Sequence, residues 1–234
     1  MGEDGAGGSR EHLLVVATRS PHKLAELRAL LHLPRTRLVS LQDVGVAEEA
    51  PEDGATFDAN AIFKARFYAE RTGLPTLADD SGIEVDALSG GPGVRSRRYA
   101  GEQATDEDNN VKLLTALHGL PAPRRGARYR CVLALAEPPK PAGGEAAAGR
   151  QEEVSPAVGH RPPRVTVRSG TFEGRIALAP RGTGGFGYDP VFEPATELPG
   201  GRTVGLYSAE EKNRVSHRAA AARAMRRVLV RRGF

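Results

Sequence analysis

The chain has 234 residues, with 33 basic and 29 acidic side chains and one cysteine. This length suits a domain with a hydrophobic core, and a single cysteine excludes an intrachain disulfide and a thiolate-rich metal site. No apolar run is long enough to span a membrane and the N-terminal residues do not resemble a signal peptide, so we expect a cytoplasmic protein without membrane contacts.

The N-terminal part of the chain alternates expected strands and helices. The apolar run at residues 13–17 is typical of a buried parallel strand. Pro21 opens a helix over residues 24–31, where leucines recur at helical spacing. Val39 and Leu41 indicate a second strand.

A second helix is expected over residues 56–71, with Asn60 and Lys64 on one face because they are one helical turn apart. An apolar run at residues 74–78 indicates a buried strand, and residues 83–87 alternate like a separate, half-exposed strand. The order of these elements predicts a parallel arrangement joined by helices.

The middle of the chain predicts a third helix and a hairpin. Residues 105–117 have helical spacing, with Val111, Leu114 and Leu117 as the expected core stripe. Strands rich in β-branched residues are expected at residues 129–136 and 164–176.

Residues 138–163 between these strands are rich in Pro, Gly, Ala and Glu, so we expect a disordered hairpin insertion there. A capping-box pattern at residues 208–211 starts a last helix that continues to Leu229. With residues 1–11 as a disordered tail, residues 12–234 are expected to form one α/β domain with a mixed sheet.

The adjacent acids Asp79 and Asp80, followed by Ser81 and Gly82, are the most informative feature for chemistry. We expect a buried strand to end here, where open α/β sheets hold ligands, and the two acids to face opposite sides. A carboxylate facing a cleft suits Mg²⁺ or the polarisation of a water. An Asx turn is the alternative.

A polar connection between the first strand and the first helix offers free backbone N–H groups and cations, which suit a polyphosphate. It lacks the Walker pattern, and a plain strand–helix connection is the alternative. Its residues are Thr18, Arg19, Ser20, Pro21, His22 and Lys23.

Two further clusters suit a purine nucleotide. Residues 182–190 include four glycines around Phe186. This composition favours an exposed aromatic ring on which a base can stack. A glycine-rich turn is the alternative. At the start of the last helix, hydrogen-bonding side chains suit acceptor atoms such as purine carbonyls. These are Lys212, Asn213, Ser216, His217 and Arg218.

The acids Glu52 and Asp53 precede the helix that carries Lys64. Acids at this position normally cap a helix. Only the nearby Asp79–Asp80 pair makes Glu52 a candidate metal ligand. The arginines of the last helix could bind nucleic acid, but the absence of interleaved aromatic residues favours a solvated face instead.

Several blocks together resemble the inosine/xanthosine triphosphate pyrophosphatases, the Ham1-like enzymes, over about residues 13–229. The matching blocks are residues 56–65, residues 78–82, residues 91–93, residues 184–190 and residues 211–218. A Maf-like pyrophosphatase is an alternative assignment that is closer in chemistry than a nucleic-acid-binding protein. The sequence blocks around Phe186 and Arg218 fit it poorly.

The resemblance implies hydrolysis of ITP, dITP and XTP to the monophosphate and pyrophosphate with Mg²⁺, by a homodimer. Because the acidic pair would repel phosphate groups in the absence of a metal, we expect no binding of nucleic acid. It also implies an elongated mixed sheet in two lobes, with the active site between them. Asp80 matches the proton acceptor and metal ligand, and Glu52 a second metal ligand. The substrate-binding positions correspond to Thr18, Arg19, Ser20, Pro21, His22, Lys23, Lys64, Ser81, Phe186, Gly187, Tyr188, Asp189, Lys212, His217 and Arg218.

The chain departs from the family pattern at Arg19 and Ser20, where the usual residues are Gly and Asn. We expect Arg19 to add positive charge at the phosphates and Ser20 to keep one weaker hydrogen bond. Ala219 also replaces the usual Gly after Arg218. These changes bear on efficiency more than on the type of reaction.

Overall fold

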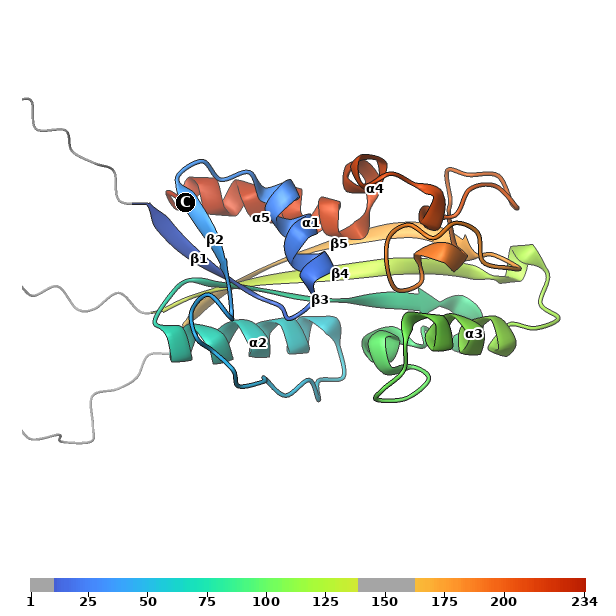
Figure 1. Ribbon diagram of the computed structural model, residues 1–234, viewed down its shortest axis with the longest axis horizontal. Helices are drawn as coiled ribbons and strands as arrows, with labels where there is room; N and C mark the ends of the chain where they lie inside the picture. The colour runs from blue at the N-terminus through green and yellow to red at the C-terminus, as the bar shows by residue number, and fades with distance from the viewer. Residues whose placement is uncertain (1–10, 139–162) are drawn as a thin grey trace, which may run out of the picture.

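The computed structural model describes residues 11–138 and 163–234, which fold around a mixed sheet with the strand order β2-β1-β3-β4-β5-β6 (Figure 1). The strands are β1 (His12–Ala17), β2 (Thr36–Ser40), β3 (Thr76–Val85), β4 (Gly126–Glu137), β5 (Arg164–Ile176) and β6 (Phe192–Pro194). The α-helices are α1 (Pro21–Leu31), α2 (Phe57–Thr72), α3 (Asp106–Ala116), α4 (Ala209–Val215) and α5 (His217–Arg231). Short 3₁₀ helices are η1 (Asp86–Leu88), η2 (Gly93–Arg98), η3 (Ala122–Arg124), η4 (Asp189–Val191) and η5 (Val204–Leu206). The predicted mixed α/β sheet is therefore confirmed.

Strand β1 is parallel to both of its neighbours, β2 and β3, whereas β3, β4, β5 and β6 pair antiparallel. The chain leaves β1 in one direction to reach β2 and returns on the other side as β3. Helix α1 lies on one face of the sheet with α5, and α2 lies on the other (Figure 1). The end of β1 is thus a topological switch point, the usual position for a ligand in such sheets.

The core consists of three apolar clusters, which explain the elongated shape and the two lobes (Figure 1). Two clusters lie on opposite faces of the parallel end, under α1 with α5 and under α2. The third lies at the far end of the long strands and includes Leu113 of α3, Leu117 and Phe192 of β6. Each lobe therefore has buried side chains of its own, and the central strands continue through both.

The expected end of a strand at the acidic pair is wrong. Strand β3 runs without interruption through Asp79 and Asp80 to Val85, so the two acids lie mid-strand and no Asx turn or second strand follows. The strand that ends here is β1: its last pair with β3 joins Ala17 to Ala78. Because β1 turns away at this point, the edge of β3 is open beside Asp79.

The expected single C-terminal helix is also wrong. Ser216 has φ −66° and ψ 160°, and its side chain accepts a hydrogen bond from the backbone N–H of Ala219, so it ends α4 and caps α5. The cap changes the direction of the chain, so the expected last helix is divided into α4 and α5. The capping box at Ser208 and Glu211 is confirmed.

Helix α3 forms where expected, and Leu117 is buried and Leu114 is half-buried as predicted, but the rest of its buried face differs. Val111 is exposed, whereas Asn109, Asn110 and Leu113 are buried. The two asparagines bond to backbone carbonyls of neighbouring segments, Arg97 and Gly187, and so bury their amides without leaving the donors unpaired. Polar packing of this kind is not visible in an apolar pattern.

Most of the predicted disordered tail and most of the predicted insertion lie outside the described residues. The hairpin that frames the insertion is confirmed, because Glu137 and Arg164 form the last antiparallel pair of β4 and β5. Within the described residues, no helix combines the length and apolar character needed to cross a membrane.

Candidate active site

A cavity of about 780 Å³ opens between the two lobes, beside the end of β1. Its volume lies within the range of small-molecule sites. All the predicted site residues line it: Thr18, Arg19, Ser20, Pro21, His22, Lys23, Glu52, Lys64, Asp80, Ser81, Phe186, Gly187, Tyr188, Asp189, Lys212, His217 and Arg218. The roles assigned to them stay predictions, but the fold brings them to one place.

The connection between β1 and α1 forms one wall of the cavity. Ser20 caps α1 and accepts a hydrogen bond from the N–H of Lys23 at 3.4 Å, while Thr18 accepts one from the N–H of Ser20 at 3.2 Å. Pro21 follows the cap at the first helical position, where its missing N–H costs nothing. The start of α1 therefore points its positive dipole end at the cavity.

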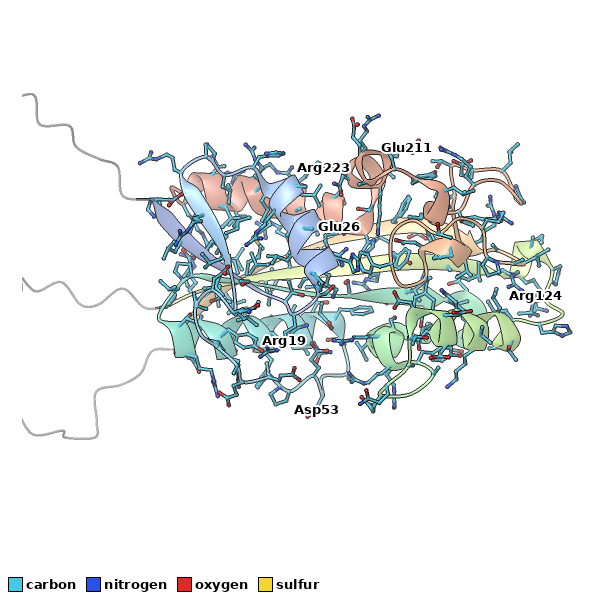
Figure 2. All side chains as sticks on the ribbon, viewed as in Figure 1. Arg19, Glu26, Asp53, Arg124, Glu211 and Arg223 are labelled. Carbon is cyan, nitrogen blue, oxygen red and sulfur yellow. The ribbon has the colours of Figure 1, made fainter. Side chains whose placement is uncertain are left out.

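Arg19 is oriented differently from our expectation. Its guanidinium donates to the backbone oxygens of Ala47 at 2.6 Å and Glu48 at 2.8 Å, and it pairs with Glu49 at 3.2 Å. In Figure 2, the labelled Arg19 lies beside the loop that leads to α2. The side chain thus holds the loop that carries Glu52, rather than presenting a free cation to a phosphate.

Asp79 is the centre of a buried ion network. Its carboxylate lies 3.0 Å from Nε of Arg218 and 2.6 Å from Nζ of Lys23, and it accepts a bond from the thiol of Cys131. Burial alone would raise the pKa of Asp79, but Arg218 and Lys23 hold it well below its usual range. Asp79 is therefore ionised, and both of its oxygens are bonded within the protein.

Arg218 is almost completely buried, with 1% of its surface exposed. Besides Asp79, it donates to Glu26 and to Oγ of Ser81, the latter at 2.8 Å. Glu26 projects from α1, as the labelled side chain in Figure 2 shows, and also pairs with Lys212 at 2.9 Å. Sequence reasoning missed Glu26, although its position three residues after Lys23 places both on the same face of α1.

Asp80 points to the opposite face of β3, as the alternation of a strand requires. Its carboxylate lies 3.2 Å from Nζ of Lys64 and accepts a hydrogen bond from Asn60 at 3.1 Å. Lys64 also pairs with Glu52 at 3.0 Å. The predicted shared face of Asn60 and Lys64 is confirmed, and it is the face that contacts Asp80.

The pKa of Asp80 is raised above its usual value because burial disfavours the charged form, and the nearby Glu52 adds to this effect; Lys64 and Lys23 oppose it. Asp79 and Asp80 are adjacent in sequence, yet their pKa values shift in opposite directions. A carboxylate whose pKa is raised in a cavity is a candidate general base.

The carboxylates of Glu52 and Asp80 converge on one ammonium group, which marks a place where positive charge is stabilised. The described residues contain no group of three or more His, Cys, Asp or Glu side chains placed to hold a metal ion. Two carboxylates suit Mg²⁺, which takes one or two protein carboxylates together with phosphate oxygens and water. The residues therefore fit an ion that arrives with a polyphosphate.

The glycine-rich loop holds Phe186 at the cavity, half-buried rather than exposed. Its ring stacks on His22 with 5.2 Å between centroids and 14° between planes, and Nζ of Lys212 lies 4.2 Å from the ring centre. Gly185 has φ +74°, and a Cβ there would lie 2.0 Å from Oδ2 of Asp189. A glycine is therefore required at position 185, because any side chain there would collide with the Asp189 carboxylate.

Asp189 anchors the same loop from inside. It accepts bonds from the N–H of Phe186 at 2.9 Å, from Nζ of Lys212 at 2.6 Å and from the hydroxyl of Tyr129 at 3.2 Å. Tyr188 donates to the backbone oxygen of Ser96 at 2.7 Å, which joins the loop to η2. Sequence reasoning missed Tyr129, because an isolated tyrosine in a strand carries no distinguishing pattern.

His217 is 4% exposed and stacks on Tyr129 with 4.6 Å between ring centroids. Burial lowers its pKa well below the usual value, and the cations Arg218 and Lys212 lower it further, so the imidazole is neutral at pH 7. Its buried Nδ1 has no hydrogen-bond partner among the described residues. A buried polar atom without a partner beside a cavity is available to a ligand.

The arrangement has counterparts in known proteins. The Ham1 family model matches residues 14–228. A dITP/XTP pyrophosphatase of Geobacter sulfurreducens is 47% identical over 209 residues, covering 89% of this chain and 92% of the relative. A protein of the same name from Anaeromyxobacter sp. is 43% identical, with 93% of this chain and 96% of the relative covered.

Solved structures agree with the sequence matches. A HAM1 protein from Coxiella burnetii superposes with a TM-score of 0.77 and 37% identity, over 94% of this chain and 99% of that one. A nucleoside-triphosphatase, or dITP/XTP pyrophosphatase, from Mycobacterium abscessus gives a TM-score of 0.67 and 38% identity, over 93% and 98% of the two chains. The similarity extends over both lobes and the cavity between them.

Proposed function

This chain belongs to the Ham1 family, and we propose that it hydrolyses non-canonical purine nucleoside triphosphates such as ITP, dITP and XTP to the monophosphate and pyrophosphate. The observation that carries the proposal is the division of the acidic pair. Asp79 is ionised and tied to Lys23 and Arg218. Asp80, on the other face of β3, has a raised pKa beside Lys64 and Glu52.

In this proposal the triphosphate lies along the wall formed by the start of α1 and by Lys64. The dipole end of α1, Lys23 and Lys64 stabilise negative charge on the phosphate oxygens. Asp80 accepts a proton from a water whose oxygen attacks the α-phosphorus. The bond from the α-phosphorus to the bridging oxygen breaks, and the electron pair leaves with pyrophosphate.

Asp80 and Glu52 would hold Mg²⁺ together with oxygens of the substrate, and the ion would neutralise charge on the phosphates. Both carboxylates already lie within 3.2 Å of the Lys64 ammonium, which keeps them in position. Although burial alone would raise it, the pKa of Glu52 is lowered from its usual value by Lys64, so this carboxylate is ionised near neutral pH.

Base recognition is assigned to the opposite part of the cavity. The purine would contact the ring of Phe186, and the neutral imidazole of His217 offers Nδ1, which has no partner among the described residues, to the base. Donors aimed at the 6-oxo group would be left unpaired by the 6-amino group of adenine, which disfavours ATP. Arg218 and Lys212 hold this part of the site through Glu26 and Asp189.

The proposal predicts release of pyrophosphate from ITP, dITP and XTP in the presence of Mg²⁺, with little release from ATP or GTP. A coupled pyrophosphate assay with a panel of nucleotides, with and without Mg²⁺, measures this directly. Release of inorganic phosphate instead, or equal cleavage of all purine triphosphates, would contradict the proposed function.

We expect Glu52→Gln to raise the Mg²⁺ concentration needed for half-maximal activity by roughly tenfold, because a charged ligand is lost while Lys64 keeps Asp80 in place. The matched control is Asp53→Asn. Asp53 is exposed at the outer edge of the same loop and does not line the cavity (Figure 2). A similar Mg²⁺ dependence in the two variants would remove Glu52 from the metal site.

The homodimer implied by the family resemblance, and the assignment of residues 12–234 to a single domain, stay predictions. Sedimentation of the purified protein tests the first, and the cooperativity of its unfolding tests the second.

A further inference from the structure

The cations of the cavity are mostly neutralised by the protein itself. Lys and Arg side chains from five segments of the described chain line the cavity, and all except Arg97 pair with a carboxylate within 4.0 Å. The pairs are Arg19 with Glu49, Lys23 with Asp79, Lys64 with Glu52, Arg98 with Glu102, Lys212 with Asp189, and Arg218 with Asp79. A polyanion that enters must compete with these carboxylates.

Arg97 differs from the other cavity cations. Arg97 is an exposed residue that lines the cavity, and its side chain has no hydrogen bond or ion pair with any of the residues that the structure describes. Its guanidinium is therefore a full positive charge with five unused donors.

The backbone around Arg97 is nevertheless held firmly. Its own carbonyl accepts a bond from Asn109 at 3.0 Å, and the carbonyl of Ser96 accepts one from Tyr188 at 2.7 Å. On the other side, Arg98 donates to the backbone oxygen of Glu52 at 3.0 Å. The segment thus connects the base side of the cavity to its acidic side, and Arg97 lies between them.

We propose that Arg97 is a further triphosphate-binding residue, which reaches the phosphates from η2, the wall opposite α1. This inference rests on the proposed function. A guanidinium fork matches the oxygens of a phosphate and forms charge-assisted, bidentate hydrogen bonds. Because Arg97 has no carboxylate partner to give up, its contact with a phosphate adds attraction without breaking an existing pair.

The test compares Arg97→Ala with Arg95→Ala. Arg95 is an exposed arginine on the same short helix, but it does not line the cavity, so it controls for loss of one charge nearby. Binding of inorganic tripolyphosphate is measured by calorimetry at about 0.15 M salt, where charges beyond roughly 8 Å are largely screened. We expect Arg97→Ala to weaken binding roughly tenfold and Arg95→Ala to leave it nearly unchanged.

Steady-state kinetics with ITP supply a second readout. Arg97→Ala is expected to raise KM roughly tenfold, with a smaller change in kcat, and Arg97→Lys to recover part of the loss. Unchanged tripolyphosphate affinity in Arg97→Ala, or an equal loss in Arg95→Ala, would overturn the inference. Tripolyphosphate binding that depends on Arg97, in a protein that does not cleave ITP, would overturn the proposed function and leave the role of Arg97 intact.

Discussion

Asp80→Asn is expected to reduce the rate of ITP hydrolysis by roughly 10³-fold while the protein stays folded, because the amide has no charge and cannot accept the proton of the attacking water. The fold should persist because asparagine has the same shape and still contacts Asn60 and Lys64. The loss should appear mainly in kcat, measured as pyrophosphate release under saturating ITP and Mg²⁺.

Asp58→Asn is the matched control for this experiment. Asp58 is exposed in the first turn of α2, away from the cavity, so its amide variant should keep wild-type activity. Circular dichroism of both variants reports whether the fold is kept. If Asp80→Asn retained more than about a tenth of the wild-type rate, Asp80 would not be the base.

The raised pKa of Asp80 also predicts the acidic side of the pH–rate profile. A general base must be deprotonated, so activity should fall as the pH drops through the folded-state pKa of Asp80. Because burial raises that pKa, the fall should begin at a higher pH than for an ordinary aspartate. The pH dependence of kcat/KM measures the pKa of Asp80 in the free enzyme. An inflection below pH 4 would contradict the prediction.

Asp79→Asn is expected to lower the free energy of unfolding by about 3–5 kcal/mol, because it removes one partner of a buried ion pair. Asp79 is 2% exposed and Arg218 is 1% exposed, so the guanidinium would keep Glu26 but lose the carboxylate at its Nε. Urea denaturation at pH 7 measures the difference between the variant and the wild type.

Asp86→Asn is a matched surface control. Asp86 pairs with Arg128 at 2.8 Å, close to the 3.0 Å of the buried pair, but both members of this surface pair are substantially exposed to water. A solvated pair of this kind contributes at most about 1 kcal/mol. Equal destabilisation by the two variants would show that the buried network does not stabilise the fold.

Asp79→Asn should also change how the stability of the fold depends on pH in acid. The folded-state pKa of Asp79 is well below its usual range, so its stabilising effect is present above the unfolded pKa, near 3.9, and is lost as the pH falls through the lower folded-state value. The wild type should therefore lose this contribution only under strongly acidic conditions. Asp79→Asn should show a flatter dependence of stability on pH in that region.

Much of the local structure follows from the sequence because its causes are local. Apolar runs and helical spacing predicted β1, α1 and α2, and a capping box predicted the start of a helix at Ser208. The blocks that resemble the Ham1 family indicated the family, which the comparisons confirm. Alternation along a strand predicted that Asp79 and Asp80 face opposite sides, and the structure agrees.

Two of the errors have their origin in contacts between distant segments, and the third has a local origin. Strand β3 continues past Asp80 because β4 pairs with it over its full length, whereas the local sequence fits a turn equally well. The break at Ser216 separates α4 from α5 because the Ser216 side chain caps α5 locally. Val111 is exposed because buried asparagines of α3 bond to carbonyls of other segments.

By itself, the sequence determined which chemical groups the site contains and the family to which the chain belongs, since residue types and their order do not depend on folding. Only the tertiary structure decided what each group does with its neighbours. Arg19 donates hydrogen bonds to the loop before α2, and Glu26 pairs with buried cations. Among the cavity cations of the described residues, only Arg97 has no carboxylate partner. The reason is physical: charge, burial and pKa are set by distances between atoms, and these distances join residues far apart in the chain.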